Sequence, residues 1–144
     1  MSSDQGTLLL SVKPRFADLI LDGTKTVELR RVAPTIEPGA FALLYASSPL
    51  CQLLGTCRII DVNVSSTAEI WKRYGQQCAL TEEEYTSYFE GARRAVAIVL
   101  DNPSRLLEQP SLKTLRQRMA GFTPPQSFRY LSPSMLEQLQ LQPA

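Results

Sequence analysis

Hydrophobic and polar residues along this chain repeat with two periods, which predicts a mixture of strands and helices. Short runs rich in leucine, valine and isoleucine have the length of strands, and the longest is expected to bend at Gly55. Between these runs, apolar residues spaced three and four apart, such as Phe16, Leu19 and Ile20, predict short amphipathic helices. The expected strands span residues 7–12, 26–31, 41–46, 51–64, 95–100 and 126–131, and the expected helices begin near residues 14, 66, 81, 111 and 132.

Local signals mark several of these boundaries. Pro14 suits the first turn of a helix, and Gly23 follows that helix where a left-handed residue is favoured. The spacings Ser66–Glu69 and Thr81–Glu84 are those of capping boxes. Strands that alternate with short helices, without regular βαβ spacing, predict an α+β fold: a small mixed β-barrel with short helices packed around it.

The segment 26–31 carries polar side chains on one face of its expected strand. Val27 and Leu29 point to one side of a strand, whereas Thr26, Glu28 and Arg30 point to the other. A sheet face that carries an acid and a base side by side is either hydrated surface or the floor of a polar cleft. The context favours the cleft.

Polar residues also end the neighbouring expected strands, so a shared site is predicted. If the strands are neighbours, Lys13, Lys25 and Arg30 converge, and Glu28 partly balances their charge. Such a site could hold a phosphate while Glu28 accepts a hydrogen bond from a base amino group. The hydroxyls of Ser47 and Thr26 would add neutral hydrogen bonds. The alternative is a structural ion pair of Glu28 on an exposed sheet face, a common arrangement of little energetic value.

Composition narrows the possible chemistry. A net charge of +1 means that any anion must bind to a local cluster of cations rather than to the molecule as a whole. The absence of histidine excludes Ser-His-Asp and Cys-His catalysis, and three cysteines without a CxxC pair are unsuited to zinc. Neither a metal nor another cofactor is therefore expected. An enzyme built on this chain would use Lys, Glu, Asp or Tyr for proton transfer.

The length of 144 residues predicts one domain, with residues 1–6 as a flexible N-terminal arm. Nothing in the sequence approaches the roughly 18 apolar residues of a membrane span, so no membrane partner is expected and a cytoplasmic location is predicted.

Two groups of residues are interpreted more plainly. Five aromatic residues could stack on bases, but their helical spacing favours core packing; they are Trp71, Tyr74, Tyr85, Tyr88 and Phe89. A basic stripe could extend an RNA path, although a solvated helix face is the default; it consists of Lys113, Arg116 and Arg118.

Several segments together resemble the ASCH domain of the PUA-like superfamily. The core is the Gly-x-Lys-Thr-x-Glu-x-Arg pattern of residues 23–30, and the resemblance covers roughly residues 8–131. The other matching segments are 10–14, 44–49, 54–56, 88–91 and 124–131. This resemblance implies a small β-barrel with a cleft that binds RNA or a nucleotide. It also implies that Lys25, Glu28 and Arg30 line the cleft, and that the neighbours are Lys13, Ser47 and Arg129.

Some small ASCH relatives are amidohydrolases that act on acetylated cytidine through a Lys, a Thr and a Glu. Lys25 matches their lysine, but Glu28 stands where their nucleophilic threonine would be. Thr26 is two residues away, a displacement of about 6–7 Å along a strand. This departure from the pattern weakens the amidohydrolase alternative without removing it, because Glu28 could act as a general base on water beside Lys25.

The sequence therefore predicts a domain that binds RNA or a modified nucleotide, with a regulatory role in translation or transcription. The alternative is a metal-independent hydrolase of an acylated nucleoside, or a ribonuclease, with Lys25 and Glu28 in acid–base roles. A third possibility is a module that meets a protein or DNA partner through the helical segment 66–91.

Overall fold

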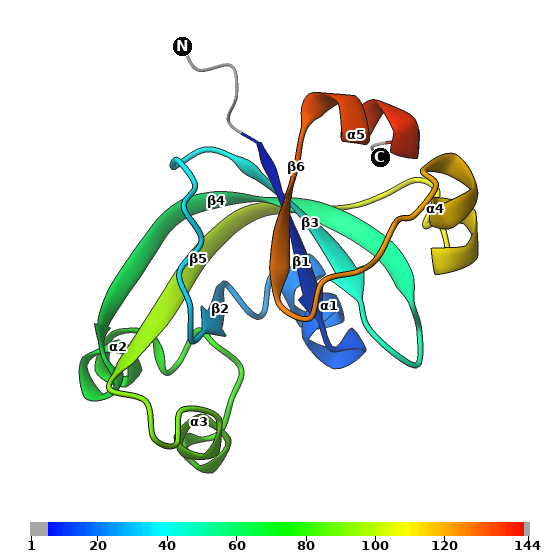
Figure 1. The fold of residues 1–144 in the computed structure, drawn as a ribbon. Coiled ribbons are helices and arrows are strands. Elements are labelled where there is room, and N and C mark those ends of the chain that lie inside the picture. Colours follow the sequence, from blue (N-terminus) through cyan, green and yellow to red (C-terminus); the bar gives the residue numbers. More distant parts are fainter. Residues whose placement is uncertain (1–5, 143–144) are drawn as a thin grey trace.

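The fold is built on one six-stranded mixed sheet in the order β2-β5-β4-β3-β1-β6 (Figure 1). The computed structural model describes residues 6–142, so most of the predicted N-terminal arm lies outside the described residues. β1 and β3 pair in parallel, and the other neighbouring strands are antiparallel. The strands are β1 (Thr7–Val12), β2 (Val27–Arg30), β3 (Phe41–Ala46), β4 (Gln52–Ser66), β5 (Arg94–Arg105) and β6 (Phe128–Leu131).

In the part of the chain that the structure describes, four short helices connect strands and a fifth, α5, follows β6; they begin where the sequence signals place them. Ser66 caps α2 through its hydroxyl, and Thr81 and Glu84 form the reciprocal capping box at the start of α3. Within residues 6–142, no helix is long and apolar enough to cross a membrane. The helices are α1 (Pro14–Leu21), α2 (Thr67–Tyr74), α3 (Glu82–Tyr88), α4 (Leu112–Arg118) and α5 (Pro133–Leu139).

The sheet is strongly curved, so it forms a half-barrel (Figure 1). The long strands β4 and β5 shift register at two places, and such bulges bend and twist a sheet. The predicted α+β fold with a mixed sheet and short helices is therefore confirmed. β2 and β6 are the edge strands of the sheet order.

One predicted strand end is wrong. β5 was expected to stop near residue 100, before Asn102 and Pro103, but it continues to Arg105. Asn102 has a φ of 52°, and the register shift opposite Cys57 lies at this point of the ladder. A bulge tolerates a proline, which has no N–H to give to the ladder. The strand therefore passes through Pro103.

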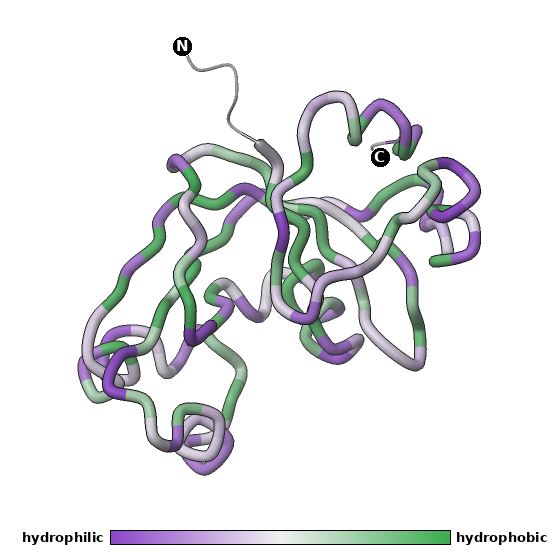
Figure 2. The backbone as a smooth tube through the Cα atoms, in the orientation of Figure 1, coloured by the Kyte–Doolittle hydropathy of each residue, from purple (hydrophilic) through white to green (hydrophobic). Residues whose placement is uncertain are grey.

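Hydrophobic residues on the two faces of the sheet form three clusters. Leu8 and Leu10 face the inside of the half-barrel, whereas Leu9, between them, packs on the other face beneath α4 and α5. A third cluster lies beneath α2 and α3 and contains Val27 and Leu29 of β2. Figure 2 shows hydrophobic and hydrophilic residues alternating along strands and helices, as expected for elements that are buried on one face.

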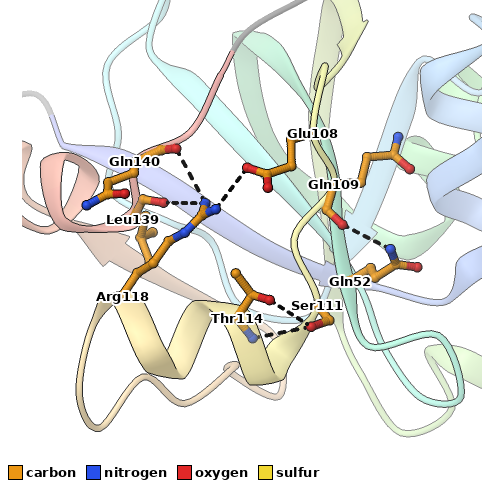
Figure 3. Close-up of polar contacts among 8 residues, drawn as sticks. All are labelled: Gln52, Glu108, Gln109, Ser111, Thr114, Arg118, Leu139 and Gln140. Carbon is orange, nitrogen blue, oxygen red and sulfur yellow. Dashed lines mark hydrogen bonds and ion pairs between the residues drawn. The ribbon is translucent and has the colours of Figure 1, made fainter.

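The basic stripe of α4 has structural partners. Figure 3 shows the Arg118 guanidinium donating to Glu108 at 2.9 Å and to the carbonyl of Leu139 at 3.1 Å. Arg116 donates to the carbonyl of Phe122 at 3.1 Å. Two of the three basic residues therefore hold α4 to α5 and to neighbouring segments of the chain. The idea that the stripe extends an RNA path loses support.

Candidate functional site

Three ionic side chains form a buried cluster at β2, which we call the triad: Lys25, Glu28 and Arg30. The Lys25 ammonium lies 3.3 Å from one carboxylate oxygen of Glu28, and the Arg30 guanidinium lies 2.8 Å from the other. The three side chains are 2%, 8% and 11% exposed, respectively. The alternative of an exposed surface pair is therefore excluded.

The alternation of β2 explains how charged groups became buried. Val27 and Leu29 enter the cluster beneath α2 and α3, so Glu28 and Arg30 must point into the half-barrel. There they lie opposite Ile98 and Val96, respectively, on β5. The predicted facing of β2 is confirmed.

The backbone and an aromatic ring complete the surroundings of the triad. The Lys25 ammonium donates to the carbonyl of Cys78 and lies 4.9 Å from the centroid of the Phe16 ring. The same nitrogen of Arg30 that meets Glu28 donates to the carbonyl of Ser11 at 2.8 Å. Two cations around one carboxylate leave one net positive charge in a region with little access to water, where electrostatic interactions are strong.

The triad forms the floor of a cavity of about 930 Å³. Its walls are the end of β1, the start of α1, helix α3, and the segment at Pro125 and Gln126. Five of the seven residues predicted for the site line this cavity, namely Lys13, Lys25, Glu28, Arg30 and Ser47. The predicted convergence of strand ends on one concave site therefore exists in the fold.

Thr26 and Arg129, the other two predicted site residues, are not among the residues that line the cavity. The backbone N–H of Thr26 donates to the carbonyl of Gln77 at 3.0 Å, one step before β2 begins. Arg129 lies opposite Leu9, so its side chain leaves the sheet on the face beneath α4 and α5. Its guanidinium donates to the carbonyl of Thr123 at 3.3 Å.

Sequence reasoning missed the contribution of α3 to the cavity. Tyr85 and Phe89 are buried as predicted, but Tyr88 is 40% exposed and lines the cavity. The interpretation of Tyr88 as a core residue is therefore wrong. The spacing contains the relevant signal: Tyr85 and Phe89 are four residues apart on one helix face, and Tyr88 lies to one side of it.

Two contacts hold α3 over the cavity. Arg15, at the start of α1, meets Glu84 at 3.3 Å, and Arg31 donates to the carbonyl of Tyr88 at 2.8 Å. The pKa of Glu84 is lowered, first by the hydrogen bond from the backbone N–H of Thr81 and then by Arg15. Since Arg15 and Glu84 are both well exposed, their pair contributes little to stability.

Three buried polar atoms have no hydrogen-bond partner among residues 6–142: Ser11 Oγ, Arg30 Nε and the hydroxyl of Tyr45. Ser11 and Tyr45 lie side by side on the parallel strands β1 and β3; Ser11 lines the cavity, and the ring of Tyr45 packs in the cluster beneath α4 and α5. Burial, together with the neighbouring Cys51 thiol, raises the pKa of Tyr45 to about 12. Buried donors and acceptors are nearly always paired in folded proteins, so each of these atoms is available to a water molecule or a ligand.

Comparison with known proteins agrees with this architecture, because the ASCH domain matches residues 10–104 of the chain. The chain belongs to the ASCH domain family. An ASCH domain-containing ribonuclease of Zymomonas mobilis is 35% identical to it over 130 residues, which cover 89% of this chain and 86% of that protein. The predicted family is therefore confirmed.

Solved structures extend the likeness to the whole fold. The crystal structure of the ASCH protein from Zymomonas mobilis has a TM-score of 0.89 and 31% identity, and the match covers 95% of each chain. Crystal structures of this ASCH protein also exist with a serine-to-alanine and with a tyrosine-to-phenylalanine substitution. The N-terminal domain of Staphylothermus marinus McrB, at 11% identity and a TM-score of 0.57, shares the fold alone.

Proposed function

We propose that this ASCH domain binds RNA in the cavity above the triad. The observation that carries the proposal is a concave site whose floor keeps one net positive charge and an unused Arg30 Nε–H. Similarity to a protein named as a ribonuclease supports RNA rather than another anion. A cavity of about 930 Å³ lies within the range of sites that enclose a small ligand, so it suits one nucleotide better than a duplex.

The lining residues differ in the part of a nucleotide that they suit. Lys13 is exposed at the rim and free to meet a phosphate, and the Ser47 hydroxyl can add a hydrogen bond. The exposed ring of Tyr88 can stack on a base. Lys25 acts through its charge, because its ammonium already meets Cys78 and Glu28. From the sequence, Lys25 was expected to bind a phosphate directly; we propose instead that it contributes only its positive charge.

Binding is tested with a fluorescently labelled RNA and two rim variants. We expect Lys13→Ala and Tyr88→Ala each to weaken binding by about 1–3 kcal/mol, the range for loss of a charge-assisted hydrogen bond or of a base stack. Lys113→Ala on α4 is the matched control, because it also removes an exposed lysine, one that does not line the cavity. Affinities of both rim variants equal to that of the control would refute the proposal.

A second candidate function is RNA cleavage, which the 35% identity to a ribonuclease favours. In cleavage by the 2′-hydroxyl, that group loses its proton to water as its oxygen bonds to phosphorus, the bond from phosphorus to the 5′-oxygen breaks, and the 5′-oxygen takes up a proton from a donor. Tyr45 does not line the cavity, so its phenol, which keeps its proton at neutral pH with a pKa of about 12, would have to deliver that proton through its neighbour Ser11, which does line the cavity. The unpartnered Ser11 Oγ beside it is available for a further hydrogen bond to the phosphate.

Cleavage is tested by incubating the protein with RNA in the presence of a metal chelator. The expected result is chelator-resistant cleavage that falls at least about tenfold in Tyr45→Phe, while RNA affinity is unchanged. Loss of cleavage in the chelator would contradict a metal-independent reaction. Full activity of the Tyr45→Phe variant would remove Tyr45 from the mechanism.

Hydrolysis of acetylated cytidine has weaker support. Thr26 does not line the cavity, and both carboxylate oxygens of Glu28 are paired with cations. Neither is therefore well placed as a nucleophile or base. Release of cytidine from acetylcytidine at high protein concentration would restore this alternative. A regulatory role in translation or transcription stays a prediction.

A further inference from the structure

We propose that bound RNA continues out of the cavity into a second hollow on the outer side of α2, where a flanking nucleotide is held. This inference rests on the proposed RNA binding and assigns it a longer path. The hollow, about 850 Å³, is lined by the end of α2 and by the chain that follows it; we call it the α2 hollow. Its lining includes Trp71, Lys72, Arg73, Gln76, Gln77 and Leu80.

The α2 hollow and the cavity are separated by a single segment of the chain. Leu80 lines both spaces. Just before it, the carbonyl of Gln77 accepts from the N–H of Thr26 at 3.0 Å, and the carbonyl of Cys78 accepts from the Lys25 ammonium of the triad. The segment 77–80 therefore separates the triad on one side from the α2 hollow on the other. Since Leu80 borders both spaces, an RNA strand that continues past Leu80 from the cavity would reach this hollow next.

The chemistry of the α2 hollow matches a nucleotide. Lys72 and Arg73 are exposed and can meet phosphates, and among residues 6–142 neither is in an ion pair. Trp71 is half-buried against Tyr85, at 4.8 Å between ring centroids, and its remaining surface can stack on a base. The amides of Gln76 and Gln77 offer both donors and acceptors for base edges.

A plainer explanation exists for the two cations. Lys72 and Arg73 lie in the last turn of α2, where positive charge complements the helix dipole. That explanation concerns stability alone and predicts no dependence on RNA. Glu82 also lines the hollow and would repel a phosphate, so its removal should affect RNA binding under the inference and leave it unchanged under the plainer explanation. If RNA enters, Glu82→Gln strengthens binding.

Trp71 is the single tryptophan of the chain, so the intrinsic fluorescence of the protein reports on the surroundings of this residue. It lines the α2 hollow and is not among the residues that line the cavity. We would titrate the protein with a dinucleotide and with a longer single-stranded RNA, both 2′-O-methylated so that neither can be cleaved. Binding would be followed in parallel by anisotropy of a labelled strand. The expected result is that both bind, but only the longer RNA changes Trp71 emission.

Substitutions then show which residues are responsible for binding the longer RNA. Lys72→Ala combined with Arg73→Ala should weaken binding of the long RNA roughly five-fold, the effect of removing two exposed charge pairs. The same double variant should reduce the slope of log affinity against log salt by about 1.4, since each phosphate that is no longer neutralised on a single strand accounts for about 0.7. Dinucleotide binding should not change. Glu82→Gln should strengthen binding of the long RNA, and Lys113→Ala should leave both RNAs unaffected.

The outcomes separate this inference from the proposed function. Dinucleotide binding without any effect of the long RNA on Trp71 would overturn the inference and leave RNA binding in the cavity intact. An unchanged salt slope in the double variant would also overturn it. If neither RNA binds, both the proposed function and the inference fall together.

Discussion

At the scale of single residues, the site depends on Glu28, which pairs with both buried cations of the triad. Replacement of Glu28 by alanine would leave Lys25 and Arg30 buried together without their counter-charge. Breaking a buried pair in this way costs about 3–5 kcal/mol. We expect Glu28→Ala to lower the free energy of unfolding, measured in urea, by that amount.

The exposed pair of Asp18 and Arg105 provides the control. Asp18→Ala should leave the urea midpoint almost unchanged, since the pair is well exposed. If Glu28→Ala were as mild as Asp18→Ala, the carboxylate would not be stabilising the triad, and its low exposure would need another explanation.

Tyr45 gives a prediction for stability at high pH. Its pKa is raised from 10.0 to about 12 in the folded protein, mainly by burial. Below pH 10 the phenol is neutral in both states, so it causes no dependence on pH. Between pH 10 and 12 the unfolded chain ionises first, and folding loses about 1.4 kcal/mol per pH unit from this group.

Removal of the Tyr45 hydroxyl should therefore reduce the loss of folding stability over this pH range. Tyr45→Phe is expected to lose less stability than the wild type between pH 10 and 12, as measured by urea unfolding across that range. Tyr85, whose pKa is also raised to about 12, remains in both proteins and keeps a common background slope. Parallel curves for the two proteins would show that Tyr45 ionises normally in the folded state.

At the scale of elements, Gly55 allows β4 to pass close to its neighbours. A Cβ atom at this position would lie 2.5 Å from the carbonyl oxygen of Ser104 and 2.6 Å from a methyl of Leu21. Overpacking of this kind costs about 1–3 kcal/mol. Gly55→Ala should therefore be destabilised by at least that amount in thermal unfolding.

A second substitution tests the reason for this loss. Leu21→Ala removes the methyl clash but not the clash with the backbone oxygen of Ser104, so Gly55→Ala should cost nearly as much in a Leu21→Ala background as in the wild type. If Gly55→Ala cost nothing in that background, the effect would belong to the Leu21 side chain alone.

Elements also show what the sequence could and could not predict. The caps of α2 and α3 and the alternation of β2 are local signals, and each was found in the structure where it was expected. The passage of β5 through Pro103 depends on a bulge opposite Cys57 on another strand. Such pairing is a tertiary property, and no local pattern around Pro103 encodes it.

The same distinction explains the site. Lys13, Glu28 and Arg30 were predicted because strand ends and alternation follow from the sequence itself. The spacing on α3 sets Tyr88 apart from the buried face, but its place in the cavity depends on how α3 lies across it, which Arg31 helps to fix from a distant part of the chain. Arg129 was included by resemblance, but the register of β6 against β1 puts it on the other face of the sheet.

At the scale of the whole molecule, three hydrophobic clusters share one sheet. The chain was predicted to form a single domain, which requires these clusters to unfold together. Trp71 reports on the cluster beneath α2 and α3, whereas circular dichroism reports on the whole backbone. We expect the two signals to give coincident urea transitions. A separate Trp71 transition in the wild type would divide the chain into two folding units.

We expect the triad to couple the unfolding of the helical segment 66–91 to that of the sheet. Lys25 links the two, since its ammonium meets both the Cys78 carbonyl in that segment and Glu28 on β2.

In Lys25→Met this link is lost, while Glu28 keeps its pair with Arg30. The carbonyl of Cys78 then loses a charged donor, at a cost of about 1–3 kcal/mol that falls on the segment alone. The Trp71 transition should therefore move to lower urea than the transition seen by circular dichroism, whereas Lys13→Met, at an exposed position of the rim, should leave the two coincident. Coincident transitions in Lys25→Met would mean that packing of Val27 and Leu29 against the segment couples the clusters without help from the triad.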